Sequence, residues 1–469
     1  MTLLQILIFA LVALLAGIVT HPQFRRWLLM VGSVLAIYWM QPSMPIRYLD
    51  FWLPTLALAL TVWVWAIVRP AEAEGKKEDV QAGVILAGVV LLVAGLRYVG
   101  PICCLTPTRP PQILSVMLVL GLVIGAGWGL SKGKAAWVGS GVSMLLIGML
   151  IVLKTPALAQ AISAGVRGLS GQQTDLATAF DIRWLGFSYL AFRLVHVLKD
   201  AGTGRVPALP LDEFVTYALF FPAYTAGPID RVQRFVGDLK KPFRVGENLL
   251  PAGQRLAMGV FKKFALADGL ALIALSDTNA TQILSPGWGW VVLYAYALRI
   301  YFDFSGYTDI AIGLGMLAGV KLPENFDAPY LKPNLTAFWN SWHMTLAQWF
   351  RAYYFNPLTR TLRGRKLPIP AVIFLTQVTT MGLIGLWHGV SWNFLIWGVW
   401  HGVGLFIHNR WSETFRARYA AWEVSPRVKG ILNGVGTVFT FHFVTLGWVW
   451  FALSQPGLAW DVFRKLAGG

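Results

Sequence analysis

Long runs of apolar residues recur along the 469-residue chain and set the first expectation about its fold. These runs are long enough to cross or enter a bilayer whose hydrocarbon core is about 30 Å thick. They cover residues 2–19, 51–68, 82–96, 113–130, 136–153, 288–300, 369–386 and 431–453. Shorter or interrupted runs lie between them, so we expect about a dozen helices, not all of which span the membrane.

The same pattern predicts an all-α fold, a polytopic membrane helical bundle with some re-entrant helices. Lipid cannot satisfy a free backbone amide, so a spanning segment must be a helix or part of a closed barrel. The chain has no ten-residue stretches of alternating apolar and polar residues of the kind that build membrane strands.

The character of the pattern changes near residue 180. Residues 1–180 hold plain apolar runs, joined by a polar linker at 69–81 (RPAEAEGKKEDVQ). In residues 181–469 the runs are shorter and are interrupted by proline, glycine and charged residues. Irregular backbone at membrane depth is tolerated only where protein or a water-filled cavity surrounds it. We therefore divide the chain into N-terminal helices at 1–180 and a catalytic core at 181–469, and we expect the functional site in the core.

Composition and charge agree with a membrane protein. Hydrophobic residues make up 56% of the chain and charged residues only 13%, compared with about 25% in soluble domains. The net charge of +17 arises from basic residues in the connections between runs, notably Arg231, Arg234, Lys240, Lys241, Arg244, Arg255, Lys262 and Lys263, and Arg351, Arg360, Arg363, Arg365 and Lys366. The positive-inside rule places such connections in the cytoplasm, beside anionic lipid headgroups. No recognised nucleic-acid-binding module accompanies the charge, so we expect no nucleic acid as a partner.

The two cysteines, Cys103 and Cys104, are adjacent. A disulfide between neighbouring residues is strained, and two thiols alone do not make a zinc site, so we interpret both as packing residues.

The segment GLWHGVSWNFLIWGVWHG, residues 385–402, carries two histidines and no charged residue. An ionisable group inside the membrane is costly enough to be a functional hypothesis by default. Gly389 and Ser391 predict a helix break after His388, which would place its imidazole at a cavity wall next to Trp387. On one straight helix His401 would point about 140° away from His388, so we interpret it as structural or cavity-lining.

A third histidine, His343, lies in FWNSWHMTLAQWF. The residues Trp339, Trp342, Leu346 and Trp349 follow helical spacing, and an aromatic stripe of this kind usually packs in a core or interface. Any of several apolar residues would pack there at lower cost than a histidine, which favours a functional role. Asn340 is its nearest strongly polar neighbour.

The motif YFDFSGYTD contains two acids, Asp303 and Asp309. On one helix they would diverge by about 120°, so they are not expected to form a carboxylate dyad. Ser305 and Gly306 predict a bend, and an acid such as Asp303 would orient a histidine or an arginine near the site.

The chain shows no His, Asp or Glu pair with the spacing of a metal-ligand set, and we expect no metal. No phosphate-binding loop or serine nucleophile motif is present. Glycines at Gly315 and Gly319, and at Gly398 and Gly402, indicate close helix packing.

A buried imidazole without a nucleophile of its own suits the transfer of an acyl group from a thioester to a hydroxyl. That reaction needs a base for the hydroxyl proton, a donor toward the oxyanion and a channel that holds both substrates. Histidine, with an ordinary pKa of about 6.5, suits the role of base.

The order of these motifs resembles the membrane-bound O-acyltransferase family between about Trp184 and Phe451. The segments that carry the resemblance are FPAYTAGPIDR, FKKFALAD, YFDFSGYTDIAIG, LPENFDAPYL, FWNSWHMTLAQWFR and GLWHGVSWNFLIWGVWHG. WLGFSYLAFR and GPIDRVQRF are similar to teichoic-acid D-alanyl transfer proteins, whereas FTFHFVTLGWVWF is more similar to alginate-type polysaccharide O-acetyltransferases.

The resemblance implies a bundle around a central funnel or tunnel, with the family's Trp-His-Gly histidine at His388 and its second histidine at His343. It also implies a thioester donor, acetyl-coenzyme A or an acyl carrier protein, and an acceptor outside the membrane that is reached directly or through an extracytoplasmic acyltransferase partner. No tightly bound cofactor is implied. Many relatives carry Arg-Asp where this chain has Arg351 and Ala352, so an ion pair at that place is not assumed.

We therefore expect a multi-pass acyltransferase of the plasma (inner) membrane. His388 and His343 are its predicted catalytic residues, and the predicted site-lining residues are Asn340, Trp387, Ser391, Asp303 and Ser305. A transporter or channel that uses the same histidines as a proton relay is the alternative. A structural partner of an export machine is a third reading, under which both histidines would tolerate substitution.

Overall fold

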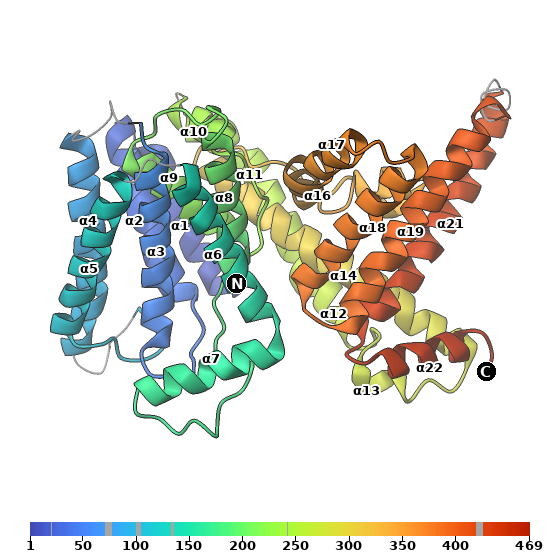
Figure 1. Ribbon diagram of the computed structural model, residues 1–469, viewed down its shortest axis with the longest axis horizontal. Helices are drawn as coiled ribbons and strands as arrows, with labels where there is room; N and C mark the ends of the chain where they lie inside the picture. Colours follow the sequence, from blue (N-terminus) through green and yellow to red (C-terminus); the bar gives the residue numbers. More distant parts are fainter. Residues whose placement is uncertain (20, 71–76, 100–104, 133–135, 242, 419–424) are drawn as a thin grey trace. The chain divides into compact units, whose positions relative to one another are not determined.

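The computed structural model describes residues 1–19, 21–70, 77–99, 105–132, 136–241, 243–418 and 425–469 (Figure 1). These residues form helices and no β-strand, apart from an isolated antiparallel bridge between Phe326 and Trp342. The predicted all-α class is therefore confirmed. Cys103 and Cys104 lie outside the described residues, and so does the middle of the polar linker at 69–81.

Each apolar run predicted from the sequence falls in a helix, to within a residue at either end. Among the described residues, six helices are long and apolar enough to cross a membrane: Leu49–Val68, Lys77–Tyr98, Ile113–Leu130, Trp137–Lys154, Ile369–His388 and Pro426–Ala452. The first run forms a shorter apolar helix, and the run at 288–300 belongs to a helix of 32 residues. Helices exceed the expected dozen because connecting segments also fold into short helices, such as those at Leu211–Leu219 and Val232–Lys240.

The described chain divides into two compact units. Unit 1 comprises Met1–Ala257 and Asp309–Pro323, and unit 2 comprises Met258–Thr308 and Glu324–Gly469. The predicted boundary near residue 180 was drawn from motifs rather than from compactness, and it stays a prediction.

Unit 1 holds α1 (Leu3–Ile18), α2 (Pro22–Met40), α3 (Leu49–Val68), α4 (Lys77–Gly95), α5 (Ile113–Lys132), α6 (Ala136–Lys154), α7 (Pro156–Leu169), α8 (Phe187–Ala201), α9 (Leu211–Leu219) and α10 (Val232–Lys240). Unit 2 holds α12 (Asp268–Ala271), α13 (Asp277–Ala280), α15 (Leu335–Trp339), α16 (Met344–Phe350), α17 (Asn356–Gly364), α18 (Ile369–His388), α19 (Trp392–Thr414), α21 (Pro426–Ala452) and α22 (Pro456–Leu466). Both units contain residues of α11 (Val245–Val260) and α14 (Pro286–Leu317).

The centre of unit 1 is α9, a short helix whose residues are all buried. Helices α2, α3, α4, α8 and α10 pack around it. Its two acids, Asp212 and Glu213, form ion pairs with Arg26 of α2 at 3.1 and 2.9 Å, and Glu213 also pairs with Lys240 of α10 at 3.1 Å. Buried charges are tolerated when they are paired in this way.

Side chains also bond to main-chain groups at both ends of α9. The carboxylate of Asp79 accepts a hydrogen bond from the main-chain N–H of Leu211 at 2.9 Å. At the other end, the buried guanidinium of Arg193 donates to the carbonyl of Ala218 at 2.9 Å and to that of Ala223, in the short turn that follows α9, at 2.7 Å. Unpaired helix-end groups would be costly in this interior, so these bonds hold α9 in place.

A second polar cluster in unit 1 surrounds Asp181, which lies in the segment between α7 and α8. Its carboxylate accepts hydrogen bonds from Arg167 Nε at 2.7 Å, Ser163 at 2.6 Å and Thr178 at 2.6 Å. Burial raises the pKa of Asp181, but these hydrogen bonds outweigh burial and the net pKa lies well below its ordinary value. The cluster anchors α7, which runs across the direction of α3 and α6 (Figure 1).

In unit 2, α18 and α19 form a tightly packed helical hairpin (Figure 1). A Cβ on Gly398 would clash with the Met381 carbonyl oxygen, and one on Gly402 would lie 2.7 Å from Val378 Cα. The close packing predicted for Gly398 and Gly402 is therefore confirmed.

The corresponding prediction for Gly315 and Gly319 is only partly right. A Cβ on Gly315 would meet Val320 and Leu322, which follow its own helix, so this glycine makes no close contact with another helix. Gly319, just beyond the end of α14, has a φ of +78°, which favours glycine, and lies closely against the side chains of Arg25 on α2 and of Phe243.

The helix α14 is continuous through Ser305 and Gly306, so the motif predicted to bend does not interrupt it. Gly306 instead permits close approach, because a Cβ there would lie 2.8 Å from the main-chain nitrogen of Lys263. The two acids of the motif have different partners: Asp303 pairs with Lys263 and Asp309 pairs with Arg255. As predicted from the sequence, the two acids do not form a carboxylate dyad.

Candidate functional site

The predicted helix break after His388 is confirmed. Helix α18 ends at His388, and α19 begins after Ser391, whose hydroxyl accepts a hydrogen bond from the Phe394 main-chain N–H. The His388 ring is half-buried and is not sealed in the core. Its ring centroid lies 4.6 Å from that of Trp387 and 4.7 Å from that of Phe451.

His343 occupies a turn rather than a helix. Helix α15 ends at Trp339 and α16 begins at Met344, with His343 between them at φ 43° and ψ 52°. The helical spacing of the surrounding tryptophans therefore does not belong to one helix. A left-handed conformation is uncommon for a residue other than glycine, and such strain persists only where the surroundings fix it.

Main-chain bonds to a second segment fix this turn. The Met344 N–H donates to the Asn325 carbonyl at 2.9 Å, and the Asp327 N–H donates to the Ser341 carbonyl at 3.0 Å. The isolated bridge between Phe326 and Trp342 lies between these two bonds. The backbone on both sides of His343 is thus held against residues 325–327.

The side chain of Asn325 determines which nitrogen of His343 carries its proton. Asn325 is fully buried, and its Oδ1 accepts hydrogen bonds from the main-chain N–H of Thr345 at 3.2 Å and from the Thr345 hydroxyl at 2.8 Å. Because a main-chain N–H can only donate, the accepting atom is the amide oxygen. Nδ1 of His343 lies 3.2 Å from the same oxygen and must therefore be protonated. In the neutral ring Nε2 is then the acceptor.

The structure brings His343 and His388 together. Both rings neighbour Trp387, whose ring centroid lies 6.3 Å from that of His343 and 4.6 Å from that of His388. His343 lies outside the candidate spans and is 4% exposed. Burial, followed by electrostatic repulsion from His388, holds the pKa of His343 well below its ordinary value. His343 is therefore neutral at physiological pH.

Two of the other predicted site residues take part in local structure. The side chain of Asn340 is exposed, and its Oδ1 accepts a hydrogen bond from Arg351 at 2.6 Å. Arg351 thus has a partner in the same motif, although Ala352 supplies no acid. Ser391 is exposed and serves as the N-cap of α19.

The residues predicted on α14 lie in different surroundings. Phe304 packs edge-on against the His343 ring, at a centroid distance of 4.6 Å. Asp303 is half exposed and pairs with Lys263. Ser305 is buried, and within the described part of the chain its hydroxyl has no hydrogen-bond partner.

Two further histidines of unit 2, the buried His401 and the half-buried His442, have aromatic surroundings. His401 is fully buried among the rings of Trp339, Trp397 and Phe443, and no described residue bonds to either of its nitrogens. His442 accepts from the Tyr294 hydroxyl at 2.9 Å and donates from Nδ1 to the Val438 carbonyl at 2.8 Å. His401 has the cavity-lining or structural surroundings that its position predicted.

Sequence reasoning missed Asn325 and Phe304. Asn325 belongs to a quoted motif, LPENFDAPYL, but no role followed from it, because its partner is 18 residues away. A strongly polar residue directly before Phe326 in an apolar segment was the available signal. Among the described residues, no group of three His, Cys, Asp or Glu side chains could hold a metal ion.

Comparisons with known proteins agree with the motifs. The sequence profile of the membrane-bound O-acyltransferase family matches residues 146–455. The chain is 31% identical over 354 residues to a probable alginate O-acetylase of Pseudomonas aeruginosa, covering 74% of this chain and 63% of that protein. It is 33% identical over 280 residues to a teichoic acid D-alanyltransferase of Bacillus subtilis, covering 58% and 69%. It is 31% identical over 264 residues to a peptidoglycan O-acetyltransferase of Helicobacter pylori, covering 55% and 47%.

Proposed function

Because the chain belongs to the membrane-bound O-acyltransferase family, we propose that it transfers an acyl group from a thioester to a hydroxyl. The observation that carries this proposal is that His388 and His343 both lie beside the Trp387 ring, among aromatic side chains. An imidazole in such a place can take a proton where little water competes.

His388 is the proposed general base, because its ring is only half-buried, whereas His343 is almost fully buried. The hydroxyl oxygen attacks the thioester carbonyl carbon, and His388 takes the hydroxyl proton. A carbon–oxygen bond forms and the carbon–sulfur bond breaks. The proton then passes from His388 to the departing thiolate, which restores the neutral ring.

His343 completes the site as a neutral ring with an accepting Nε2. Its burial and its repulsion from His388 both oppose a second proton on the pair. The two histidines therefore carry one positive charge at most, on His388. Nε2 of His343 can accept a hydrogen bond from the protonated base or from the hydroxyl. Asn325 holds His343 in the tautomer that this role needs.

The names of the relatives indicate the substrates. We propose that the group transferred is acetyl or D-alanyl, and that the acceptor is a hydroxyl of a cell-envelope polysaccharide or a teichoic acid. The proposed donor is acetyl-coenzyme A or an acyl carrier protein on the cytoplasmic side of the plasma (inner) membrane. Transfer is direct or passes through an extracytoplasmic acyltransferase partner.

Substitution of His388 by alanine tests the catalytic assignment. Purified protein in vesicles, supplied with labelled acetyl-coenzyme A or a D-alanyl carrier protein and an acceptor polymer, should lose activity by about 10²- to 10⁴-fold. His21→Ala is the matched control, because His21 is exposed at the start of α2 and belongs to unit 1.

Two outcomes would contradict the proposal. If folded His388→Ala retains acyl transfer, His388 is not the base. If the wild type moves protons across the vesicle membrane but transfers no acyl group from either donor, the chain is a transporter or channel rather than an enzyme.

A further inference from the structure

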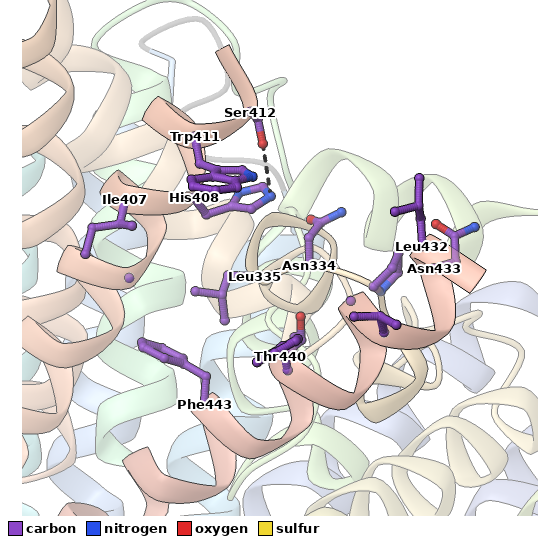
Figure 2. Close-up of a pocket in the computed structure, with 15 residues that line it drawn as sticks. Asn334, Leu335, Ile407, His408, Trp411, Ser412, Leu432, Asn433, Thr440 and Phe443 are labelled. Atoms are coloured by element: carbon purple, nitrogen blue, oxygen red, sulfur yellow. Dashed lines mark hydrogen bonds between the residues drawn. The ribbon is translucent and has the colours of Figure 1, made fainter. Parts of the chain in front are cut away.

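A cavity of about 650 Å³ lies in unit 2 between α19 and α21, apart from the histidine pair (Figure 2). Its volume is typical of a site for a small molecule or for part of a larger one. The lining residues on α19 run from Gly404 to Ser412, those on α21 run from Leu432 to Phe443, and Pro333–Leu335 close a third side. Neither His343 nor His388 lines it.

The polarity of the lining changes from one end to the other. His408, Ser412, Asn334 and Asn433 gather toward one end, together with Trp411, and Phe443 lies at the other, with Thr440 as its nearest labelled polar side chain (Figure 2). The polar end is ordered, because His408 is bonded to Ser412 and to Thr336 at 3.2 Å each. A ligand that fits this gradient has a polar head and an apolar tail.

The cavity opens along apolar side chains of the kind that face lipid. Ile407, Val435 and Phe439 line it and are 59%, 50% and 72% exposed. Helix α21 is a candidate membrane span, so a bilayer would cover these residues. Trp411, 53% exposed at the polar end, is of the type that marks the headgroup level.

The length of the cavity matches one leaflet. Its lining on α21 extends from residue 432 to residue 443. At a rise of 1.5 Å per residue this is about 16 Å, or roughly half of a 30 Å hydrocarbon core.

Basic residues lie near the polar end along the chain. Arg416 and Arg418 lie four and six residues beyond Ser412, past the end of α19 at Thr414, and Arg427 precedes Asn433 by roughly 9 Å of helix on α21. All three arginines are exposed, whereas the nearby acid Glu413 is paired with Arg410. An anionic head is the charge complement of this end, and basic clusters between helices at the cytoplasmic face suit anionic lipid headgroups.

We propose that this cavity binds one anionic glycerophospholipid of the cytoplasmic leaflet. One acyl chain lies along the α19–α21 lining, and the phosphate lies near Arg416, Arg418 and Arg427. The cytoplasmic side follows from the basic residues that flank this end of α18, α19 and α21, including those at 360–366. The site is independent of the acyl-transfer proposal, because it uses none of the catalytic residues.

Native mass spectrometry of the full chain released from detergent tests the proposal, with phosphatidylglycerol and phosphatidylcholine as the probes. The wild type should retain one phosphatidylglycerol in preference to phosphatidylcholine. Val435→Trp, which places a large ring in the cavity from a half-exposed position, should abolish retention of both lipids. The double variant R416E/R427E should lower the preference for phosphatidylglycerol by about fivefold or more per charge, while leaving the chain folded. Arg363→Glu, at an exposed position on α17, is the matched control and should retain the lipid as the wild type does.

Three results would overturn the proposal. The first is equal retention of both lipids by the wild type. The second is unchanged retention in Val435→Trp. The third is displacement of the lipid by acetyl-coenzyme A, which would assign the cavity to the acyl donor instead. Folding of each variant is checked by its elution volume and helical circular dichroism.

Discussion

Nδ1 of His343 lies 3.2 Å from Oδ1 of Asn325, an oxygen whose identity is fixed by the main-chain N–H that also donates to it. This contact sets the tautomer of a buried imidazole without any carboxylate. A carboxylate at the same place would stabilise a charged ring, whereas an amide oxygen orients the ring and leaves it neutral. The arrangement suits a histidine that must accept a proton or hydrogen bond rather than carry a permanent charge.

Replacement of Asn325 by aspartate should change the charge beside His343 while keeping the orientation of its ring. The carboxylate keeps the acceptor for Thr345 and His343, but its charge should raise the pKa of His343 by about 1–3 units. His343 is then protonated at higher pH, so the acid limb of the activity profile should move to higher pH. The pH dependence of kcat with saturating donor measures the shift.

Asn325→Ala is the companion variant. It leaves three donors without their acceptor and should reduce stability by about 1–3 kcal/mol as well as lowering kcat. An Asn325→Asp profile that coincides with that of the wild type would show that Asn325 does not act through His343.

Replacement of Gly385 by alanine should disrupt the hairpin that carries His388. A Cβ at Gly385 would clash with the Phe394 carbonyl oxygen, so α18 and α19 would have to separate. We expect a loss of about 1–3 kcal/mol in the free energy of unfolding, together with reduced acyl transfer. Unfolding in mixed detergent micelles measures the first effect.

The matched control is Gly148→Ala on α6, where a Cβ would meet no atom within 4 Å. It should change stability by less than about 1 kcal/mol, and in the stabilising direction, because alanine favours a helix interior. Equal losses in both variants would argue against close packing as the cause.

The Asp181 cluster should make stability depend on pH in the acid range. The pKa of Asp181 is lower in the folded chain than its ordinary value of 3.8, so its ionised form favours folding. This contribution is fully present above about pH 4 and is lost as the pH falls below that value toward the folded pKa. Unfolding measured at pH 6 and at pH 3 should show a smaller difference for Asp181→Asn than for the wild type.

Asp181→Asn should also lower stability at pH 6 by about 1–3 kcal/mol, since Arg167 loses a charged partner. Asp175→Asn, at an exposed position in the same segment, is the control. The assignment fails if both variants show the same pH dependence as the wild type.

The helices and the break after His388 could be predicted because both depend on residues that are close together in the sequence. Apolar runs of sufficient length define their own helices, and Gly389 followed by Ser391 supplies a helix end and a new N-cap within four residues. Close packing at Gly398 and Gly402 follows similarly from their spacing on one helix.

The features that escaped prediction depend on residues far apart in the chain. Asn325 acquires its role only when the turn at 341–344 is held against it. Helix α9, with two acids in its first turn, has the sequence of a half-exposed helix, yet Arg26 pairs with Asp212 and Glu213 from 186 and 187 positions away. The left-handed backbone of His343 likewise has no local signal, because the flanking tryptophans keep the spacing of a continuous helix.

The main-chain bonds on both sides of His343 fix the direction in which a side chain at this position points, whichever residue stands there. The main-chain bonds between residues 325–327 and 341–344 form without the imidazole, whose Nδ1 adds one further contact to Asn325 Oδ1. A different residue at this position would still project from the same point toward Trp387. The residue at position 343 could therefore be exchanged for another reactive residue, in a related protein or by design, while the main-chain bonds that hold the turn are kept.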